Sequence, residues 1–194
     1  MGYYLVAALA GYLFGSIPTA YIVVKQLTGQ DIRQIGSGNV GATNVKRAAG
    51  TKPFIFVLVV DLLKGTIPVL ISKAIFPHLY LLHVIVAFMT VIGHSKSIFL
   101  GFAGGKSAAT GLGGMIGLAP LPALLLGLIA FTITRLSRIV SLGSITASIL
   151  APFVLYLFKY PLEYVIYAAV AGAYVIFLHR ANIQRLLKGT ENRI

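Results

Sequence analysis

Gly93 to Thr110 reads GHSKSIFLGFAGGKSAAT, a glycine-rich polar segment that lies between two long apolar runs. Successive glycines allow backbone N–H groups to point into one concavity, which is how many proteins hold a phosphate group. Lys106 follows Gly104 and Gly105 directly, and its ammonium would add a positive charge for the phosphate. The alternative is a membrane loop whose glycines make a turn and whose lysines lie among lipid headgroups. The segment alone leaves both interpretations open.

The composition restricts the class of protein. Of the 194 residues, 58% are hydrophobic and only 10% are charged, whereas a soluble domain is about a quarter charged. We therefore predict an all-α integral membrane protein with a single polytopic domain, residues 1–194. The chain has no cysteine, which excludes disulfides and thiolate metal sites. The net charge of +12 does not indicate nucleic-acid binding, because the basic residues lie in short loops between apolar runs.

The apolar runs predict the membrane topology. They are residues 3–24, 53–75, a run ending near 93, then 107–119, 121–134, 139–158 and 162–178. Pro120 and Pro122 leave open whether residues 107–134 form one tilted helix or two short ones. Two helices give a seven-transmembrane-helix bundle with nearly all of the 16 Lys and Arg residues on one side. The positive-inside rule then predicts an outside N-terminus, a cytoplasmic C-terminus and glycine-rich loops that face the cytoplasm. The N-terminus lacks a positive start and a small-residue cleavage site, so we expect a retained first span.

A second glycine-rich segment, GSGNVGATNVKR, spans residues 36–47. It contains G-x-G-x-x-G, but residues 27–35 are polar and do not form the buried strand that must precede a dinucleotide-binding loop. What remains is either an interfacial turn or a phosphate-binding loop with Arg47 as a fork for phosphate oxygens. The candidate binding side chains of this loop are Ser37, Asn39, Thr43, Asn44 and Arg47.

Some motifs exclude activities rather than support them. The GGKS sequence lacks the spacing of a P-loop and follows no strand, which argues against nucleotide hydrolysis. His94 is not followed by an Asp at the spacing of the H-x-x-x-x-D acyltransferase dyad.

Asp61 and Lys64 lie three residues apart on one face of a predicted span. They are functional candidates because of their membrane depth, but mutual neutralisation in a structural ion pair is the simpler interpretation.

Two further sites carry candidate reactive groups. Ser144 lies with two other serines on one face of a predicted helix, where hydroxyls either serve close helix packing or contact substrate. His179 and Asn182 lie three residues apart where the last span ends. A histidine there either marks the membrane interface or acts as a general base that Asn182 helps to orient.

Together these motifs closely resemble the bacterial acyl-phosphate–glycerol-3-phosphate acyltransferase family over nearly the whole chain. The resemblance rests on GSGNVGATN with Arg47, DLLKG, the 93–110 segment, SLGSI and HRANIQRLLKGTENR. The chain departs from the family at Ser107, where GGKG is usual, and near Ser97, where a proline is usual.

The resemblance implies transfer of a fatty acyl group from acyl phosphate to the position-1 hydroxyl of glycerol 3-phosphate. The products are lysophosphatidic acid and phosphate, at the committed step of phospholipid synthesis in the bacterial inner membrane. A soluble phosphate acyltransferase that makes acyl phosphate is the implied partner. The expected phosphate-binding groups are Ser37, Asn39, Thr43, Asn44, Arg47, Gly104, Gly105 and Lys106, and the expected catalytic groups are Ser144, His179 and Asn182.

No cofactor or metal is expected, because acyl phosphate already carries a good leaving group and the four acidic residues are scattered along the chain. The proton of the attacking hydroxyl passes either to His179 or to the departing phosphate, and the sequence does not choose between them. A small-anion transporter is the rival class. It would place polar groups near the midplane of several spans, whereas the polar segments here are predicted to gather at one surface. A purely structural membrane protein would not need four such segments.

Overall fold

The computed structural model describes residues 2–194, which fold almost entirely into helices. Apart from an isolated bridge between Ser97 and Ala103, these residues contain no β-structure. The α-helices are α1 Gly2–Ser16, α2 Thr19–Thr28, α3 Ala42–Ala49, α4 Thr51–Ile75, α5 Tyr80–Ser95, α6 Ala108–Leu118, α7 Pro120–Ser137, α8 Val140–Leu157, α9 Leu162–Leu178 and α10 Arg180–Leu187. Two short 3-10 helices, Ile32–Gln34 and Ile98–Leu100, lie in the loops.

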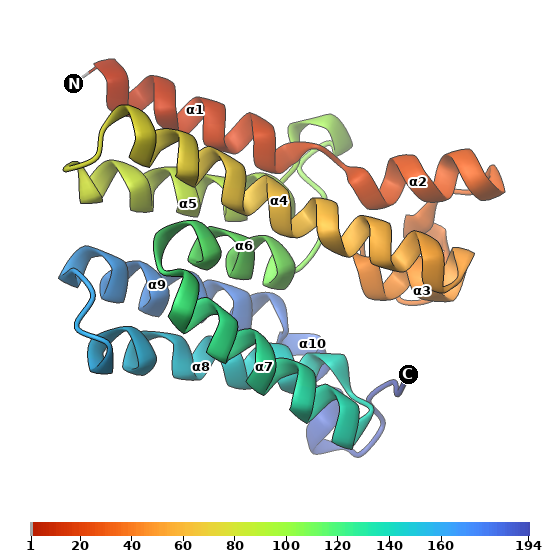
Figure 1. Cartoon of the computed structure of the whole chain (residues 1–194). Coiled ribbons are helices and arrows are strands. Elements are labelled where there is room, and N and C mark those ends of the chain that lie inside the picture. The colour runs from red at the N-terminus through yellow and green to blue at the C-terminus, as the bar shows by residue number, and fades with distance from the viewer. Residues whose placement is uncertain (1) are drawn as a thin grey trace.

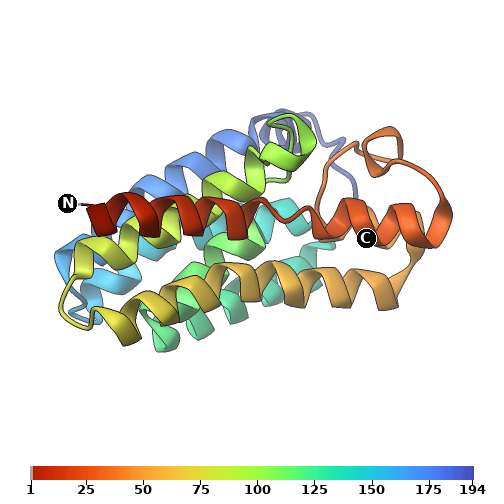
Figure 2. The same ribbon diagram turned by 90° about the horizontal axis from the view of Figure 1, so that it is seen from above.

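The helices form a bundle with α6 at its centre (Figures 1 and 2). Helices α1, α4 and α5 lie on one side of α6, and α7, α8 and α9 lie on the other. Helix α6 contacts α4, α5, α7 and α9, so it joins the two sides. The N-terminus lies at one end of the bundle, and α2, α3 and the C-terminus lie at the other.

Several helices are long and apolar enough to cross a membrane. Four candidates meet that test within the described residues: 2–28, which includes both α1 and α2, and helices α4, α7 and α8. A fifth is obtained if α9 and α10, which bend by 62° at their junction, count as one span. Helices α5 and α6 are apolar but shorter. The chain is therefore an all-helical membrane protein, while the seven crossings and the orientation of the termini stay predictions.

Prolines decide where two of the predicted runs are interrupted. Residues 107–134 form two helices, as the sequence analysis preferred, because α6 ends at Leu118 and Pro120 begins α7. The first run was expected to be one span with Pro18 inside it; residues 2–28 remain one candidate span, interrupted at Ile17 and Pro18 between α1 and α2. Proline has no N–H to donate and disfavours helical angles at the residue before it, which accounts for the break.

Helices α4 and α6 approach each other closely because glycines face the contact. A Cβ on Gly65 would overlap the carbonyl oxygen of Thr110, and a Cβ on Gly113 would overlap that of Leu62. The hydroxyl of Thr66 donates a 2.8 Å hydrogen bond to the carbonyl oxygen of Gly113 across the same contact. Small residues that permit such backbone contacts, with hydroxyls bonding across them, are typical of membrane helix pairs.

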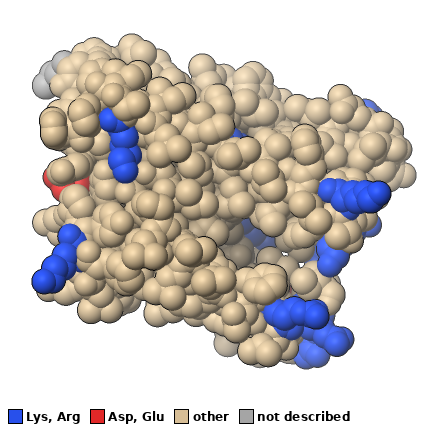
Figure 3. All heavy atoms as spheres, viewed as in Figure 1, with Lys and Arg blue, Asp and Glu red and all other residues tan. Residues whose placement is uncertain are grey.

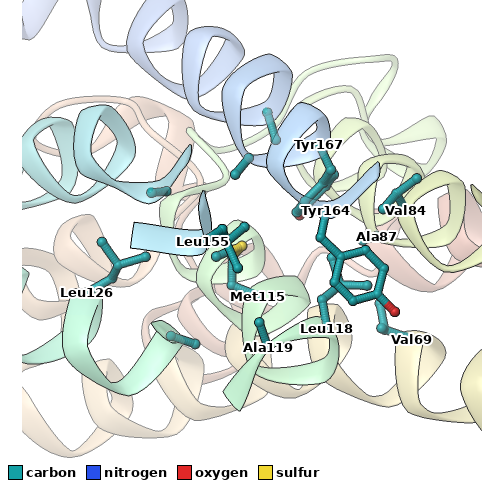
Figure 4. Packing of buried hydrophobic residues seen from close by; sticks show 14 of the residues in the cluster. Val69, Val84, Ala87, Met115, Leu118, Ala119, Leu126, Leu155, Tyr164 and Tyr167 are labelled. Atoms are coloured by element: carbon teal, nitrogen blue, oxygen red, sulfur yellow. The ribbon is translucent and has the colours of Figure 1, made fainter. Parts of the chain in front are cut away.

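Two apolar clusters hold the ends of the bundle. The larger cluster joins α6 to α7, α8 and α9 through residues such as Met115, Leu126, Leu155 and Tyr167 (Figure 4). The smaller cluster packs α2, α3 and the Ile32–Gln34 helix against α4, and its fully buried members include Val24, Ile32, Val45 and Val57. The smaller cluster fixes the loop of residues 36–41 relative to α4.

We expect Gly113→Ala to destabilise the protein, because the new methyl group would overlap the backbone of α4. Overpacking of this kind typically costs about 1–3 kcal/mol. Gly111→Ala on the same helix is the matched control, since its Cβ would meet only a Val91 methyl at 3.8 Å. Thermal unfolding in detergent checks the prediction. Equal melting temperatures for the two variants would contradict it.

Candidate functional site

A cavity of about 710 Å³ opens between the helices and is polar at one end and apolar at the other. Figure 3 shows a hollow between the upper and lower layers of helices, with basic side chains inside it. The polar end is lined by Ser37, Asn39, Thr43, Arg47, Lys106, Ser141, Ser144, His179, Asn182, Arg185 and Glu191. The apolar end is lined by Leu58, Leu62, Leu112, Met115, Leu126, Phe131, Ala147, Ala151 and Ala171. Such a cavity suits a ligand with an anionic head and a hydrocarbon tail.

Asn44 fixes the conformation of the loop of residues 36–41. Its side-chain oxygen accepts from the backbone N–H of Ser37 at 3.1 Å, and its amide nitrogen donates to the carbonyl oxygens of Ile35 at 2.9 Å and Ile32 at 3.2 Å. Asn44 is buried, and both of its polar atoms have protein partners. Its observed role is to fix this loop, which presents Ser37 and Asn39 to the cavity.

The loop that carries Lys106 is attached to the end of α5. The backbone N–H of Gly105 donates to the carbonyl oxygen of His94 at 3.0 Å, and the Ser107 hydroxyl donates to that of Val91 at 2.7 Å. Ser107 has a φ of 59°, a left-handed conformation that favours glycine and here is supported by its side-chain hydrogen bond. Gly104 packs against the backbone of His94, so a Cβ there would overlap the carbonyl oxygen. Of the GGK sequence, the Lys106 side chain is the part that lines the large cavity.

A hydrogen-bonded network connects Lys106 to the C-terminal segment. The Lys106 ammonium donates to the side-chain oxygen of Asn182, whose amide nitrogen donates to Glu191. The Glu191 carboxylate also accepts from the Ser141 hydroxyl at 2.8 Å and from the Arg185 guanidinium at 2.6 Å. The Glu191 side chain is only 5% exposed. This carboxylate therefore orders α8, α10 and the chain end around the polar end of the cavity.

Glu191 and Arg185 were not predicted from the sequence as site residues, and Ser141 was one of the three serines from which Ser144 was preferred. The signal that was available is the polar run after His179, which continues as far as Arg193. Gly189 turns the chain at a φ of 69°, and the N–H of Thr190 then donates to the carbonyl oxygen of Arg185 at 2.8 Å. This turn brings Glu191 back over α10, a reversal that spacing alone does not reveal.

His179 and Ser144 also line the cavity. The Nδ1 atom of His179 lies 2.8 Å from the carbonyl oxygen of Val175. Since a carbonyl only accepts, Nδ1 carries the proton, and in the neutral ring Nε2 is left as an acceptor. The Ser144 hydroxyl donates to the carbonyl oxygen of Val140 at 3.1 Å, within its own helix. Its lone pairs remain for a ligand group.

Burial and charge shift the pKa values of two groups in the network. Burial lowers the pKa of Lys106, and the nearby positive charges of Arg185 and Arg47 lower it further, against the opposing effect of Glu191. Burial alone would raise the pKa of Glu191, but the hydrogen bonds from Asn182, Arg185 and Ser141 outweigh burial, so its pKa lies below the ordinary value. A bound phosphate would restore the charge balance around three clustered cations.

Within residues 2–194, no three His, Asp or Glu side chains come together as metal ligands would. Asp61 and Lys64, which the sequence suggested as a structural pair, do form a buried ion pair with 2.8 Å between the Lys64 ammonium and Asp61 Oδ1.

The comparisons with known proteins agree with this geometry. Residues 5–189 match the family model described as glycerol-3-phosphate acyltransferase. The chain belongs to the glycerol-3-phosphate acyltransferase family. A similar curated relative is glycerol-3-phosphate acyltransferase 2 of Moorella thermoacetica, which is 47% identical over 98% of this chain and 97% of its own length. The glycerol-3-phosphate acyltransferase of Synechococcus sp. (strain JA-3-3Ab) is 46% identical over 98% of this chain and 93% of its own length.

Solved structures of a family member resemble the whole bundle. A crystal structure of PlsY, an integral membrane glycerol 3-phosphate acyltransferase in its glycerol 3-phosphate form, is 42% identical, with a TM-score of 0.94 over 98% of this chain and 95% of that one. The lysophosphatidic acid form of PlsY is 40% identical, with a TM-score of 0.91 over 98% and 95%. The family fold thus extends through both the polar and the apolar ends of the cavity.

We expect Glu191→Gln to lower the melting temperature at pH 7 by about 2–4 °C, because it removes the charge from the network. A carboxyl group whose pKa is lower in the folded protein than in the unfolded chain stabilises the fold at pH values above its ordinary pKa of about 4.3. This contribution is lost as the pH falls through the pKa that the group has in the folded protein. The difference between wild type and variant should therefore shrink on acidification. Melting temperatures measured across this pH range test the prediction.

Asp31→Asn is the control for this pH series. Asp31 also has a lowered pKa, caused by its hydrogen bonds with Arg33, but that pair lies at the surface. Surface pairs contribute little to stability. A difference for Glu191→Gln that stays constant down to pH 3, or that Asp31→Asn reproduces, would contradict the assignment.

Proposed function

We propose that the protein transfers a fatty acyl group from acyl phosphate to the position-1 hydroxyl of glycerol 3-phosphate, giving lysophosphatidic acid and inorganic phosphate. The observation that carries the proposal is the continuity of one cavity from a cationic end to an apolar end. Acyl phosphate has the matching shape, a phosphate attached to a hydrocarbon chain. The PlsY structures are a glycerol 3-phosphate form and a lysophosphatidic acid form, and these ligands are the acceptor and product of the same reaction.

The residues of the polar end divide by chemistry. In the proposal, Lys106 and Arg47 hold the phosphate groups of the two substrates, and Ser37, Asn39 and Thr43 add hydrogen-bond donors. The backbones of Gly104 and Gly105 support Lys106 from behind. Asn182 keeps Lys106 directed into the cavity and, with Ser144, orients the acceptor hydroxyl and the acyl carbonyl. Catalysis then consists of positioning and charge stabilisation.

The proposed step needs no cofactor and no metal. The hydroxyl oxygen of glycerol 3-phosphate attacks the carbonyl carbon, and a new C–O ester bond forms. The bond between that carbon and the phosphate oxygen breaks, and phosphate leaves with the electron pair. We assign the hydroxyl proton to Nε2 of His179, since Nδ1 is already engaged with Val175. The departing phosphate is the alternative acceptor.

We place the protein in the bacterial inner membrane with seven crossings, the N-terminus outside and the C-terminus in the cytoplasm. This orientation places the polar end of the cavity on the cytoplasmic side, where glycerol 3-phosphate is dissolved. The apolar end would receive acyl chains from the membrane lipid, and a soluble phosphate acyltransferase would supply the acyl phosphate. The reaction would then be the committed step of phospholipid synthesis.

Purified protein in lipid should form lysophosphatidic acid from labelled glycerol 3-phosphate when acyl phosphate is the only donor. Parallel reactions with acyl-CoA and with acyl-carrier protein identify the donor. Product from acyl-CoA alone would support the acyltransferase activity but contradict the assignment of acyl phosphate as the donor. No product from any donor, with uptake of glycerol 3-phosphate into proteoliposomes, would instead support an anion transporter.

His179→Asn should lower kcat about 100-fold or more, because asparagine can keep the hydrogen bond to Val175 but has no atom in place of Nε2. His179→Gln, which places a polar atom near the position of Nε2 but does not supply a base, serves as the companion variant. Rates are measured with saturating acyl phosphate. Activity of His179→Asn within about tenfold of wild type would assign the proton to the departing phosphate.

A further inference from the structure

A second, smaller polar cluster lies behind the Lys106 loop. Asp61 and Lys64, one turn apart on α4, are 2% and 4% exposed. The Lys64 ammonium lies 2.8 Å from Asp61 Oδ1 and also donates to the carbonyl oxygen of Ile17 at 3.1 Å. Ile17 lies at the break between α1 and α2, where backbone groups lack helical partners. Lys64 thus joins α4 to this break.

Four polar atoms around this ion pair lack a hydrogen-bond partner within residues 2–194. They are Asp61 Oδ1, His94 Nδ1, Ser16 Oγ and Thr19 Oγ1, all in residues at least nine-tenths buried. Asp61 Oδ1 has the charge of Lys64 beside it, but no hydrogen bond of acceptable geometry. His94 Nδ1 lies 3.8 Å from Asp61 Oδ1, which is too far for a direct hydrogen bond. Buried polar groups in native proteins nearly always have hydrogen-bond partners, so these four atoms indicate a partner that is not a protein group.

The residues of all four atoms line one small cavity of about 10 Å³. That volume is about the least that can hold one water molecule, and a buried water usually makes about three hydrogen bonds. Half of its twelve lining residues have polar side chains, which can give a buried water its hydrogen-bond partners. A carboxylate oxygen accepts from water, hydroxyls can donate or accept, and a histidine Nδ1 does either according to its tautomer.

We propose that this cavity binds one water molecule that bridges Asp61 to His94, and that the completed network positions the loop carrying Lys106. The second half rests on the proposed function, in which Lys106 binds substrate phosphate. His94 and Asp61 line both the small cavity and the large one, so they form the wall between them. His94 and Asp61 are positioning residues in this proposal.

His94 reaches the Lys106 loop through two contacts. Its carbonyl oxygen accepts from the backbone N–H of Gly105 at 3.0 Å. Its ring lies directly against Gly105, so a Cβ on that glycine would overlap Nε2. The orientation of the imidazole therefore sets the position of Gly105, the residue before Lys106. A bridging water on the Nδ1 side of the ring fixes that orientation.

The matched variants His94→Asn and His94→Leu test the network. Asparagine places a polar atom where the imidazole has Nδ1, while leucine has a similar size and no polar atom. His94→Leu should raise KM for glycerol 3-phosphate about tenfold or more with a smaller change in kcat, since small misplacements in a site have large effects on rate. His94→Asn should stay within about threefold of wild type. KM values within about threefold of wild type for both variants, with both folded by thermal unfolding, would overturn the positioning role, and equally raised values would overturn the part assigned to the bridging water.

A crystal structure of the wild-type protein, at a resolution that shows ordered waters, tests the site itself. We expect one water within hydrogen-bond distance of Asp61 Oδ1 and His94 Nδ1. An empty cavity, or a direct His94–Asp61 hydrogen bond, would overturn the water site. This result does not depend on activity. If the wild type transfers no acyl group from any donor, the proposed function fails while the water site is still decided by the crystal structure.

Discussion

The site depends on the hydrogen bonds that the Glu191 carboxylate accepts. A carboxylate with a side chain only 5% exposed requires several donors, and here they are Asn182, Arg185 and Ser141. Because Asn182 also accepts from Lys106, the same network directs a lysine from the α5–α6 loop into the cavity. Three parts of the chain that are far apart in sequence are thereby placed around one volume. A phosphate that entered would meet an arrangement already formed, which lowers the reorganisation needed at the reacting centre.

The helix packing explains why this volume exists. Glycines bring α4 and α6 into backbone contact, while α7 and α8 stand on the other side of the cavity with small residues such as Ala147 and Ala151 toward it. Helix α4 also lines the cavity, through Leu58 and Leu62. Apolar walls then continue from the cationic end into the bundle. One cavity can therefore hold both the soluble and the lipid part of a substrate.

Much of this arrangement was predictable from local patterns. Apolar runs located the helices other than α3 and α10, and Pro120 indicated the division between α6 and α7. Lys106, Arg47, His179 and Asn182 were chosen for their chemistry, and the fold brings them to one cavity. Their catalytic and binding roles stay predictions.

Other features depend on tertiary contacts that spacing does not encode. In the sequence, Glu191 is only one of four scattered acidic residues. In the structure, the turn at Gly189 places it over α10. Asn44 was a candidate phosphate ligand, and its polar atoms bond to the backbone of Ile32, Ile35 and Ser37. Gly105 was expected to offer its N–H to phosphate, whereas that N–H bonds to His94. Asn44 and Gly105 show that a group suited to binding a ligand is also suited to holding the protein backbone.

The most direct test is a structure of the protein with glycerol 3-phosphate and an acyl phosphonate, an unreactive analogue of acyl phosphate. We predict both head groups at Lys106 and Arg47, the acyl chain along Leu58 and Met115, and the acceptor hydroxyl about 3–3.5 Å from the carbonyl carbon. An acyl chain outside the cavity, or head groups bound away from Lys106, would contradict it.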